Sequence, residues 1–489
     1  MTRLSRATLA NLPASIERPA YDPAALGIGI VHLGLGAFQR AHMAAYLQPL
    51  LAGDPRWGVA GASLRSDDTR DALTPQDGLY ALCEASGDGD RITVMGGLRA
   101  IHGPADGDAL MRRMVAPDTR IVSLTVTEKG YLRGSDGGLD LADPGVRADL
   151  SGTAAPRTVP GLLVAALRQR REAGLAPFTV LSCDNLPGNG HVVARILSDY
   201  ARADGSGLAD WIADTVACPN TMVDRIVPAT TDADRRRIAA ALGLEDAWPV
   251  MAEPFSQWVI EDRFPAGRPA WEDSGATMVA DARPWEEMKL RLLNGSHSTI
   301  AYLGLLAGWE TVADAMRVPA LADHVAALMD ESAATLRMAP GTDLGGYRDQ
   351  LLQRFRNTAL KHRTRQIASD GSQKIPQRLL APGAVLAAEG RGMDRIALGI
   401  AAWLRVAGGH ADDGKPLPLD DPQAGTLRAL AAPGRSPDAV VAALFDESGL
   451  VPERDRHPAL RDAITRMLTA LATYGAAGTL DRLRAGSPL

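Results

Sequence analysis

Three polar side chains of types used in proton transfer lie close together on a segment with helical periodicity. Lys289, Asn294 and His297 occur in the run KLRLLNGSHS, which follows Pro284 and two acidic residues, the usual beginning of a helix. At about 100° per residue, His297 lies about 80° and Asn294 about 140° around the helix from Lys289. The three side chains therefore share one side of a predicted helix that continues to about Leu305.

A lysine among apolar neighbours has a specific chemical use. Burial disfavours its charged form, so such a lysine becomes a usable proton donor and acceptor. Glu286 lies three residues before Lys289 and could pass protons to it. The alternative is a solvent-facing lysine beside a capping asparagine and a histidine satisfied in the core. Each residue alone favours that alternative, whereas the three on one face favour a general acid–base site.

Two further polar clusters directly follow apolar runs. Thr125–Tyr131 (TVTEKGY) follows IVSL, and Asn185 comes just after FTVLSC. In an open parallel sheet the loops at the carboxyl ends of the strands form the ligand crevice, so Glu128, Lys129 and Asn185 are candidates for a site. A solvated Glu–Lys turn, and turn chemistry around DNLPGNG, would explain the same composition.

A glycine turn follows the first apolar run, IGIVHL, and precedes AFQRAHMAAYLQPLLA, which has the spacing of one helix. Gly34 and Gly36 would allow backbone N–H groups to approach a pyrophosphate at a helix N-terminus. Gln39, however, replaces the third glycine of a dinucleotide-binding fingerprint. An ordinary tight turn between a strand and a helix would have the same composition.

The end of the second predicted strand bears on the choice of dinucleotide. Asp67 or Asp68 could hold the ribose hydroxyls of NAD, although an acid at the start of a helix is commonly just a cap. Arg65 could instead meet the 2′-phosphate of NADP. The sequence therefore favours NAD without excluding NADP.

Cations gather around an Asp-Gly turn in the segment HRTRQIASDGSQKIPQR, residues 362–378. This concentration suits an anionic or polyhydroxylated ligand, because arginine binds carboxylates in a bidentate manner. A charge run is more often a solvated surface. The cations are Arg363, Arg365, Lys374 and Arg378, and His362 begins the segment.

The elements that must carry these residues divide the chain in two. A strand, a glycine turn, a helix and a second strand follow one another over the length of one βαβ unit. β-branched runs recur at Arg91–Val94, Thr119–Val126 and Phe178–Cys183, which predicts a mainly parallel sheet. Ala/Leu/Arg-rich helical stretches replace them in the remainder. We expect an α/β domain at 1–283 and a mostly α-helical domain at 284–489.

Composition excludes several other classes of protein. Of 489 residues, 46% are hydrophobic and 22% charged, and 52 Lys+Arg against 58 Asp+Glu leave a net charge of −6. This balance lacks the basic footprint of nucleic-acid binding. No window approaches the ~18–20 apolar residues of a membrane span, and no export signal is visible, so we expect a cytoplasmic protein. Three distant cysteines, Cys83, Cys183 and Cys218, support neither disulfides nor a thiolate metal cage.

Together the motifs resemble those of the long-chain polyol dehydrogenase family, which includes mannitol 2-dehydrogenases and fructuronate reductases. IVHLGLGAFQRAH, TVTEKGY, SCDNLPGNG, PNTMVDRIVPAT, EPFSQWVIED, KLRLLNGSHS and QIASDGSQKIPQR occur in the family's order. The resemblance implies an N-terminal Rossmann-type domain, a helical C-terminal domain, an active site between them and no metal. It implies Lys289 as general acid/base, Asn185 and Asn294 as an oxyanion-hole-like pair, His297 as a substrate-orienting residue and Glu286 as a proton-relay acid.

The remaining site residues follow from the same resemblance. The cofactor would be NAD, with NADP not excluded, bound by Gly34, Gly36, Phe38, Arg65, Asp67 and Glu128. The substrate would be a small sugar acid or polyol bound by Lys129, His362, Arg363 and Lys374. We expect no nucleic-acid or membrane partner, and a monomer or small homo-oligomer.

Departures from the family's pattern bear on the substrate. Gln39 stands where the family usually has histidine, so any cofactor role of that histidine is lost. Gln366, eight residues before Lys374, replaces an arginine expected in mannitol-specific members, and TEKGY with Lys129 resembles the fructuronate reductase branch. We therefore expect interconversion of D-fructuronate and D-mannonate by hydride transfer. The alternatives are a neutral-polyol dehydrogenase, such as a mannitol 2-dehydrogenase or D-arabinitol dehydrogenase, and a dinucleotide-binding sensor without turnover.

Overall fold

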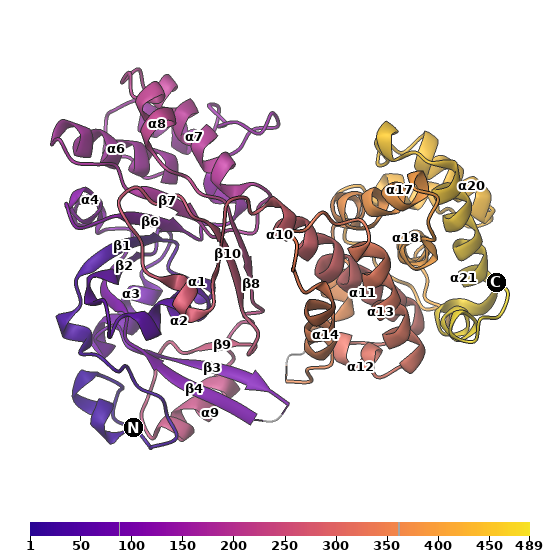
Figure 1. The fold of residues 1–489 in the computed structure, drawn as a ribbon, viewed down its shortest axis with the longest axis horizontal. Coiled ribbons are helices and arrows are strands. Elements are labelled where there is room, and N and C mark those ends of the chain that lie inside the picture. Colours follow the sequence, from indigo (N-terminus) through magenta and orange to yellow (C-terminus); the bar gives the residue numbers. More distant parts are fainter. Residues whose placement is uncertain (88, 360–361) are drawn as a thin grey trace. The chain divides into compact units, whose positions relative to one another are not determined.

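The computed structural model describes residues 1–87, 89–359 and 362–489, which form two compact units (Figure 1). Met1–Arg283 form the first unit and Pro284–Leu489 the second. The division falls where the sequence changes from strand-rich segments to Ala/Leu-rich helical ones. The first unit is α/β and the second is helical, as the sequence predicts.

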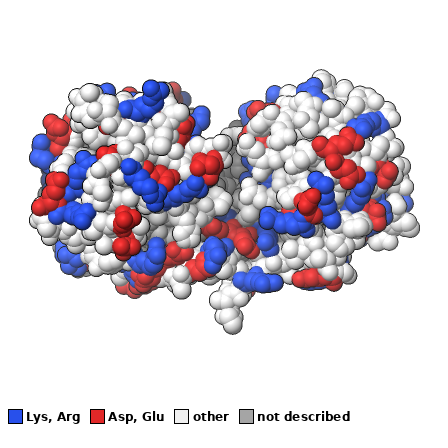
Figure 2. Space-filling view, turned by 90° about the horizontal axis from the view of Figure 1, so that it is seen from above, with Lys and Arg blue, Asp and Glu red and all other residues white. Residues whose placement is uncertain are grey.

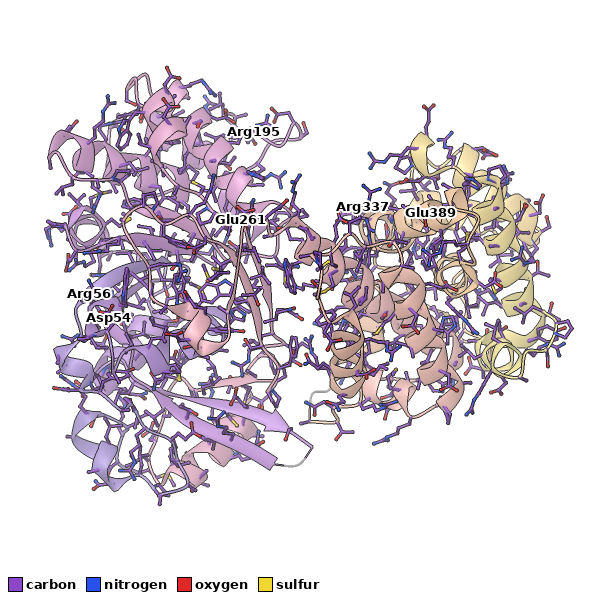
Figure 3. All side chains as sticks on the ribbon, viewed as in Figure 1. Asp54, Arg56, Arg195, Glu261, Arg337 and Glu389 are labelled. Atoms are coloured by element: carbon purple, nitrogen blue, oxygen red, sulfur yellow. The ribbon has the colours of Figure 1, made fainter. Side chains whose placement is uncertain are left out.

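Charged side chains of both signs are mixed on the surface. On the face shown in Figure 2, Lys and Arg lie among Asp and Glu, and no single sign of charge covers it. Opposite charges pair locally, as Asp54 and Arg56 do at 2.6 Å just before the second strand of the first unit (Figure 3). None of the helices formed by the described residues is both long and apolar enough to cross a membrane.

A five-stranded parallel sheet forms the centre of the first unit. Its strands are β1 (Ile28–Leu33), β2 (Gly58–Ala62), β5 (Leu98–His102), β6 (Ile121–Leu124) and β7 (Thr179–Ser182), in the order β5-β2-β1-β6-β7. Val31 of β1 pairs with Ala60 of β2 and with Val122 of β6. The chain extends the sheet from β1 to one side and then, from β6, to the other. The switch point of this Rossmann-type order therefore lies between β1 and β6.

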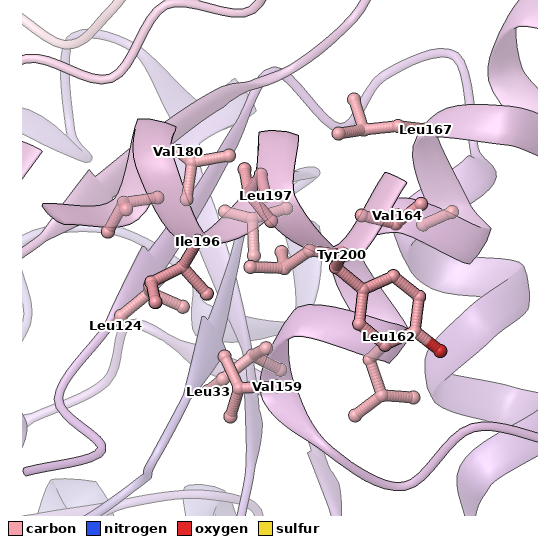
Figure 4. Packing of buried hydrophobic residues seen from close by; sticks show 14 of the residues in the cluster. Leu33, Leu124, Val159, Leu162, Val164, Leu167, Val180, Ile196, Leu197 and Tyr200 are labelled. Carbon is pink, nitrogen blue, oxygen red and sulfur yellow. The ribbon is translucent and has the colours of Figure 1, made fainter. Parts of the chain in front are cut away.

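Helices complete the first unit. They are α1 (Ala37–Ala41), α2 (Met43–Leu47), α3 (Asp68–Leu73), α4 (Gly107–Val115), α5 (Pro144–Leu150), α6 (Val159–Glu172), α7 (Asn189–Ala203), α8 (Ala209–Thr215) and α9 (Asp232–Leu242). Successive residues of a strand point to opposite faces of a sheet, so the strands serve two cores. Val31, Leu33 and Leu124 pack with α4, α6, α7 and α8 in one core. Figure 4 shows part of this core, in which Leu33 and Leu124 lie among residues of α6 and α7. Ile30 and Ile121 face the other core, with α1 and α2.

The described residues of the first unit also form two three-stranded sheets. In the first, the antiparallel hairpin of β3 (Tyr80–Ser86) and β4 (Gly89–Met95) is extended by β9 (Val250–Ala252). The second consists of β8 (Thr221–Asp224), β10 (Gln257–Glu261) and β11 (Thr277–Val279). The β-branched run Arg91–Val94 is thus a strand, but of a hairpin; the parallel sheet instead uses β5, whose sequence LRAIH carries little β-branched signal.

The single helix expected after the glycine turn is interrupted. Its segment forms α1 and α2, which are separated at His42 (φ −107°, ψ −76°). The His42 ring stacks on Phe38 with centroids 4.9 Å apart, and its Nε2 hydrogen-bonds to the Gln257 carbonyl at 2.9 Å. These tertiary contacts hold His42 in a conformation that breaks the helical periodicity.

The second unit consists of helices packed around one central helix. The run predicted from Pro284 to about Leu305 is present as α10 (Arg283–Met288), the π-helical segment η8 (Lys289–Asn294) and α11 (Gly295–Ala307). α11 is buried along almost its whole length. The surrounding helices are α12 (Val312–Met316), α13 (Pro319–Ala333), α14 (Leu344–Phe355), α15 (Thr364–Ile367), α16 (Gly371–Ile375), the π-helical η9 (Pro376–Leu380), α17 (Ala381–Ala388), α18 (Asp394–Ala407), α19 (Ala424–Leu430), α20 (Pro437–Asp446) and α21 (Pro458–Arg484).

Candidate functional site

The glycine turn after β1 is fixed by a close approach to the end of β6. Gly34 has a φ of +94°, and a Cβ atom at this position would overlap the carbonyl oxygen of Thr125. Glycine is therefore required here for both backbone conformation and space. The Thr125 hydroxyl donates a 2.8 Å hydrogen bond to the Gly34 carbonyl, which joins the turn to β6.

A buried histidine supports this turn from within the sheet. His32 hydrogen-bonds through Nδ1 with the Ser123 hydroxyl at 2.9 Å and through Nε2 with the Thr125 hydroxyl at 2.8 Å. Burial lowers the pKa of His32 to about 3, so the ring is neutral at physiological pH. Sequence reasoning missed His32, although a histidine inside the apolar run IGIVHL is a visible signal.

The second glycine of the turn faces open space. Gly36 is exposed, and a Cβ atom there would meet only the Gly34 carbonyl oxygen, at 3.7 Å. A cavity of about 520 Å³ lies here, bounded by the loops that follow β1, β2 and β6. Gly34, Gly36, Arg65 and Lys129 of the predicted site line it. The cavity thus lies at the switch point of the sheet, where such folds bind ligands.

A second depression, of about 720 Å³, adjoins this cavity. The two share Thr127, Lys129, Leu132 and Asp143, and Glu128 lines the depression. Their combined size suits an extended ligand such as a dinucleotide. The wall also contains residues that sequence reasoning did not select: Ser63, Ser66, Thr69, Arg157 and Thr158.

Two residues assigned to the cofactor site, Phe38 and Asp67, line neither the cavity nor the adjoining depression. Phe38 stacks against His42 instead. The carboxylate of Asp67 forms an ion pair of 2.9 Å with Arg70, which also pairs with Asp106 at 3.2 Å. Asp67 is thus held by its own helix, and no sequence signal distinguishes this arrangement from an acid that faces a ribose.

The loop after β6 is held by an acid that sequence reasoning passed over. The carboxylate of Asp184, just after β7, accepts hydrogen bonds from the backbone N–H groups of Val126 at 3.0 Å and Thr127 at 2.9 Å. The Tyr131 hydroxyl donates to the same carboxylate at 2.7 Å and lies 2.6 Å from the Ser182 hydroxyl. Burial raises the pKa of Asp184, and these hydrogen bonds oppose that rise.

These hydrogen bonds to Asp184, here called the Asp184 clamp, hold a residue with a strained backbone conformation beside the cavity. Thr127 has a φ of +63° and a ψ of 166°, a region that is otherwise reserved for glycine. The strained residue leads directly into the turn that exposes Glu128 and Lys129. On the other side of the clamp, Asn185 follows Asp184 and is exposed. Asp184 therefore fixes the backbone next to three predicted site residues, which are Glu128, Lys129 and Asn185.

In the second unit, the predicted acid–base residues lie on a π-helical turn rather than on a regular α-helix. Lys289 and Asn294 are the first and last residues of η8, and His297 follows in α11. The angles predicted for an α-helix do not apply across η8, because a π-helix has more residues per turn. Lys289 and His297 are each 8% exposed, and Glu286 is half-buried one turn earlier. Insertions of this kind are frequent at functional sites.

A second π-helical segment packs against the first. Gly295 allows η9 to approach, because a Cβ atom there would lie 3.1 Å from the Arg378 carbonyl oxygen. The Arg378 guanidinium group donates to the Asn294 carbonyl at 3.4 Å and to the Ser298 hydroxyl at 3.1 Å. Burial lowers the pKa of Arg378 to about 10, so it remains a cation. This arginine ties the backbone of Asn294 to η9.

His297 and His362, distant in sequence, lie together in the second unit. Their rings meet edge to face with centroids 5.2 Å apart, and His297 also packs on Phe355 at 4.6 Å. Burial lowers the pKa of both histidines, so both are neutral at physiological pH.

The cations of the segment 362–378 have different environments. Arg363 and Arg365 are exposed, whereas Arg378 is directed to Asn294 and Ser298. The Lys374 ammonium group donates to the Ser369 carbonyl at 2.7 Å and lies 3.6 Å from Asp370. Burial lowers the pKa of Lys374, and the nearby Arg378 adds to this effect.

Possible metal ligands and the three cysteines were the remaining reactive side chains that the sequence singled out. No group of three or more His, Cys, Asp and Glu side chains there could hold a metal ion. Cys83, Cys183 and Cys218 are buried free thiols, as their isolated positions in the sequence predict.

Comparisons with known proteins agree with this two-part organisation. Residues 28–273 match the model of the mannitol dehydrogenase Rossmann domain, and residues 281–472 match that of the mannitol dehydrogenase C-terminal domain. The D-mannonate oxidoreductase of Escherichia coli is 45% identical over 89% of this chain and 90% of its own. The polyol:NADP oxidoreductase of Gluconobacter oxydans is 41% identical over 86% of this chain and 89% of its own. Pseudomonas fluorescens mannitol 2-dehydrogenase, solved with NAD and D-mannitol, superposes with a TM-score of 0.82 at 37% identity, covering 99% of this chain and 100% of that one.

Proposed function

Because the chain belongs to the mannitol dehydrogenase family, we propose that it interconverts D-fructuronate and D-mannonate with NAD as the hydride carrier. It is an oxidoreductase that acts on a secondary alcohol and the corresponding ketone. The observation that carries this reaction type is the buried Lys289 on a π-helical turn that ends at Asn294. The choice of substrate depends on the likeness to the D-mannonate oxidoreductase.

The first unit supplies the dinucleotide site. Gly36 leaves its backbone accessible at the switch point, and the adjoining cavity is large enough for the adenosine and diphosphate parts of the cofactor. Arg157 on its wall offers positive charge to a diphosphate. When bound, NAD carries the hydride to and from the substrate carbon.

The second unit supplies the proton. In the direction of reduction, the C5 ketone of fructuronate becomes an alkoxide as the hydride arrives. Lys289 gives this oxygen a proton, and in oxidation it takes the proton back. The side-chain amides of Asn294 and Asn185 donate N–H groups to the developing charge. Glu286 relays protons to Lys289, and His297 orients the substrate with its neutral ring.

Several features support a sugar acid as the substrate. Lys374 keeps a half-buried ammonium group near Asp370, and Lys129 is exposed in the first unit. A carboxylate can form charge-assisted hydrogen bonds with such ammonium groups. Gln366 is exposed where a mannitol-specific enzyme is expected to carry arginine. We therefore assign Lys129, Lys374, Arg363 and His362 to the binding of the substrate.

A neutral-polyol dehydrogenase is the second candidate, because relatives that act on polyols are nearly as similar to this chain. The test compares initial rates of NADH oxidation by the purified full-length protein with D-fructuronate and with D-fructose. We expect kcat/KM to be at least about 100-fold higher for fructuronate. Lys374→Gln should reduce this preference, since it removes a charge that only the uronate uses.

The outcomes separate the candidates. Equal turnover of fructose, or of mannitol in the reverse direction, would assign the chain to the neutral-polyol group. Binding of NADH without turnover of any of these compounds would favour a dinucleotide-binding sensor.

A further inference from the structure

The loop that follows β2 presents a cation and hydroxyl groups to the cofactor cavity. Ser63, Arg65 and Ser66 of this loop line the wall. In dinucleotide-binding folds this position separates two cofactors: an acid binds the ribose 2′-hydroxyl of NAD, and an arginine accommodates the 2′-phosphate of NADP. From the loop after β2, the wall of this cavity contains an arginine, Arg65, and no acid.

The two acids that follow Ser66, Asp67 and Asp68, do not line the cavity. Asp67 is ion-paired with Arg70 at 2.9 Å, and Asp68 is exposed in α3. Within the described residues, the carboxylate on the cavity wall is that of Asp143, which belongs to a different loop. Its Oδ1 accepts the N–H of Gly145 at 2.8 Å and caps α5.

Arg65 is available to an anion. Its side chain is exposed, and no hydrogen bond or ion pair of its guanidinium group occurs within the part of the chain that the structure describes. A guanidinium group binds phosphate through two parallel N–H donors, and hydroxyl groups can add further donors. Arg157, on the same wall, adds a second positive charge to the cavity.

We propose that this chain accepts NADP(H) alongside NAD(H), with Arg65 and the hydroxyl groups of Ser63 and Ser66 holding the 2′-phosphate. The inference rests on the proposed dinucleotide-dependent function and adds the phosphate subsite to it. The ribose 2′-hydroxyl of NAD then meets a serine hydroxyl rather than a carboxylate, so NAD is bound without being selected.

Two adenosine nucleotides isolate this subsite from the rest of the cofactor and from turnover. The full-length protein is titrated by calorimetry with 5′-AMP and with adenosine 2′,5′-bisphosphate. We expect the bisphosphate to bind more tightly to the wild type. Arg65→Ala should weaken the bisphosphate by at least about tenfold and leave 5′-AMP unchanged. Arg112→Ala, which removes an exposed arginine of α4 outside the cavity wall, is the matched control and should keep both affinities.

A second variant adds a negative charge to the subsite instead of removing the positive one. Ser63→Asp places a carboxylate directly after β2, so it should repel the 2′-phosphate while it retains 5′-AMP. A wild type that binds the two nucleotides equally, or an Arg65→Ala variant with the wild-type preference, would overturn the inference and leave the proposed function intact. Failure of the wild type to bind either nucleotide would overturn the dinucleotide site itself.

Discussion

The hydroxyl of Tyr131 donates a 2.7 Å hydrogen bond to the carboxylate of Asp184, and this bond joins the loops that follow two neighbouring strands of the parallel sheet. The same carboxylate accepts two backbone N–H groups, one of them from the strained Thr127. The loop with Glu128 and Lys129 is therefore positioned from β7, the strand that also leads to Asn185.

Asp184→Asn should release this loop. An amide offers one acceptor where the carboxylate offers two, and its NH₂ group would face N–H donors. We expect kcat/KM to fall roughly 10- to 100-fold, because misplaced binding groups are costly to orientation. Tyr131→Phe leaves both backbone hydrogen bonds intact and should have a smaller effect. Asp210→Asn, an exposed acid on α8, is the control for a lost charge. Steady-state kinetics of the four proteins make the comparison, and an unchanged Asp184→Asn variant would contradict the positioning role.

The two glycines of the turn after β1 should respond differently to alanine. Gly34→Ala places a methyl group against the Thr125 carbonyl at an unfavourable φ, so we expect a loss of about 2 kcal/mol or more in the free energy of unfolding. Gly36→Ala has space and an ordinary φ, so it should fold normally. It should nevertheless weaken NADH binding, because the methyl group stands where the backbone meets the cofactor. Urea unfolding and NADH fluorescence titration separate the two effects, and equal stability of the two variants would refute the assignment of strain to Gly34.

Lys289→Ala should abolish most turnover while the protein still binds NADH. The loss in kcat is expected at about 10²- to 10⁴-fold, the usual contribution of a positioned acid–base group. Lys415→Ala is the matched control, since that lysine is exposed and pairs with Asp413. Initial rates with fructuronate and an NADH titration test both halves of this prediction. Wild-type turnover in the Lys289→Ala protein would remove Lys289 from the chemistry.

Glu331 should make the stability of the second unit depend on pH. Its carboxylate accepts the N–H groups of Arg395 at 3.1 Å and Ile396 at 3.0 Å at the beginning of α18, and burial raises its pKa from 4.5 to about 7. The folded protein therefore retains a proton that the unfolded chain has released. The stabilisation is complete below about pH 4.5 and is lost as the pH rises through about 7, so the free energy of unfolding should decline over this interval.

Glu331→Gln should flatten this part of the pH profile, because a glutamine can accept the same N–H groups without titrating. Urea unfolding at several pH values between about 5 and 8 provides the measurement. Glu389→Gln, which changes an exposed acid of the same unit (Figure 3), should leave the slope as it is. Parallel profiles for the wild type and Glu331→Gln would exclude this group as the source.

The mainly parallel α/β character of the first half and the helical character of the second half follow from local patterns in the sequence. Apolar runs separated by a helix and a glycine turn are sufficient to specify a parallel α/β unit, because each strand must be buried on both faces. Local patterns failed where long-range contacts decide. The ring of His42 is held by Gln257 and Phe38, so one predicted helix is two. The strand β5 has a weak β signal and is formed by its pairing with β2.

The chemistry of the site was visible in the sequence because it depends on residue type: Gly34 and Gly36 in one turn, and Lys289, Asn294 and His297 within one helical run. Their environment was decided only by tertiary structure. η8 packs against η9, whose Arg378 binds the Asn294 carbonyl, and Asp67 is ion-paired with Arg70. The clamp at Asp184 and the support from His32 require strands that are far apart in the chain. Hydrogen bonds and ion pairs select partners by distance in space, and a sequence read one segment at a time does not contain those distances.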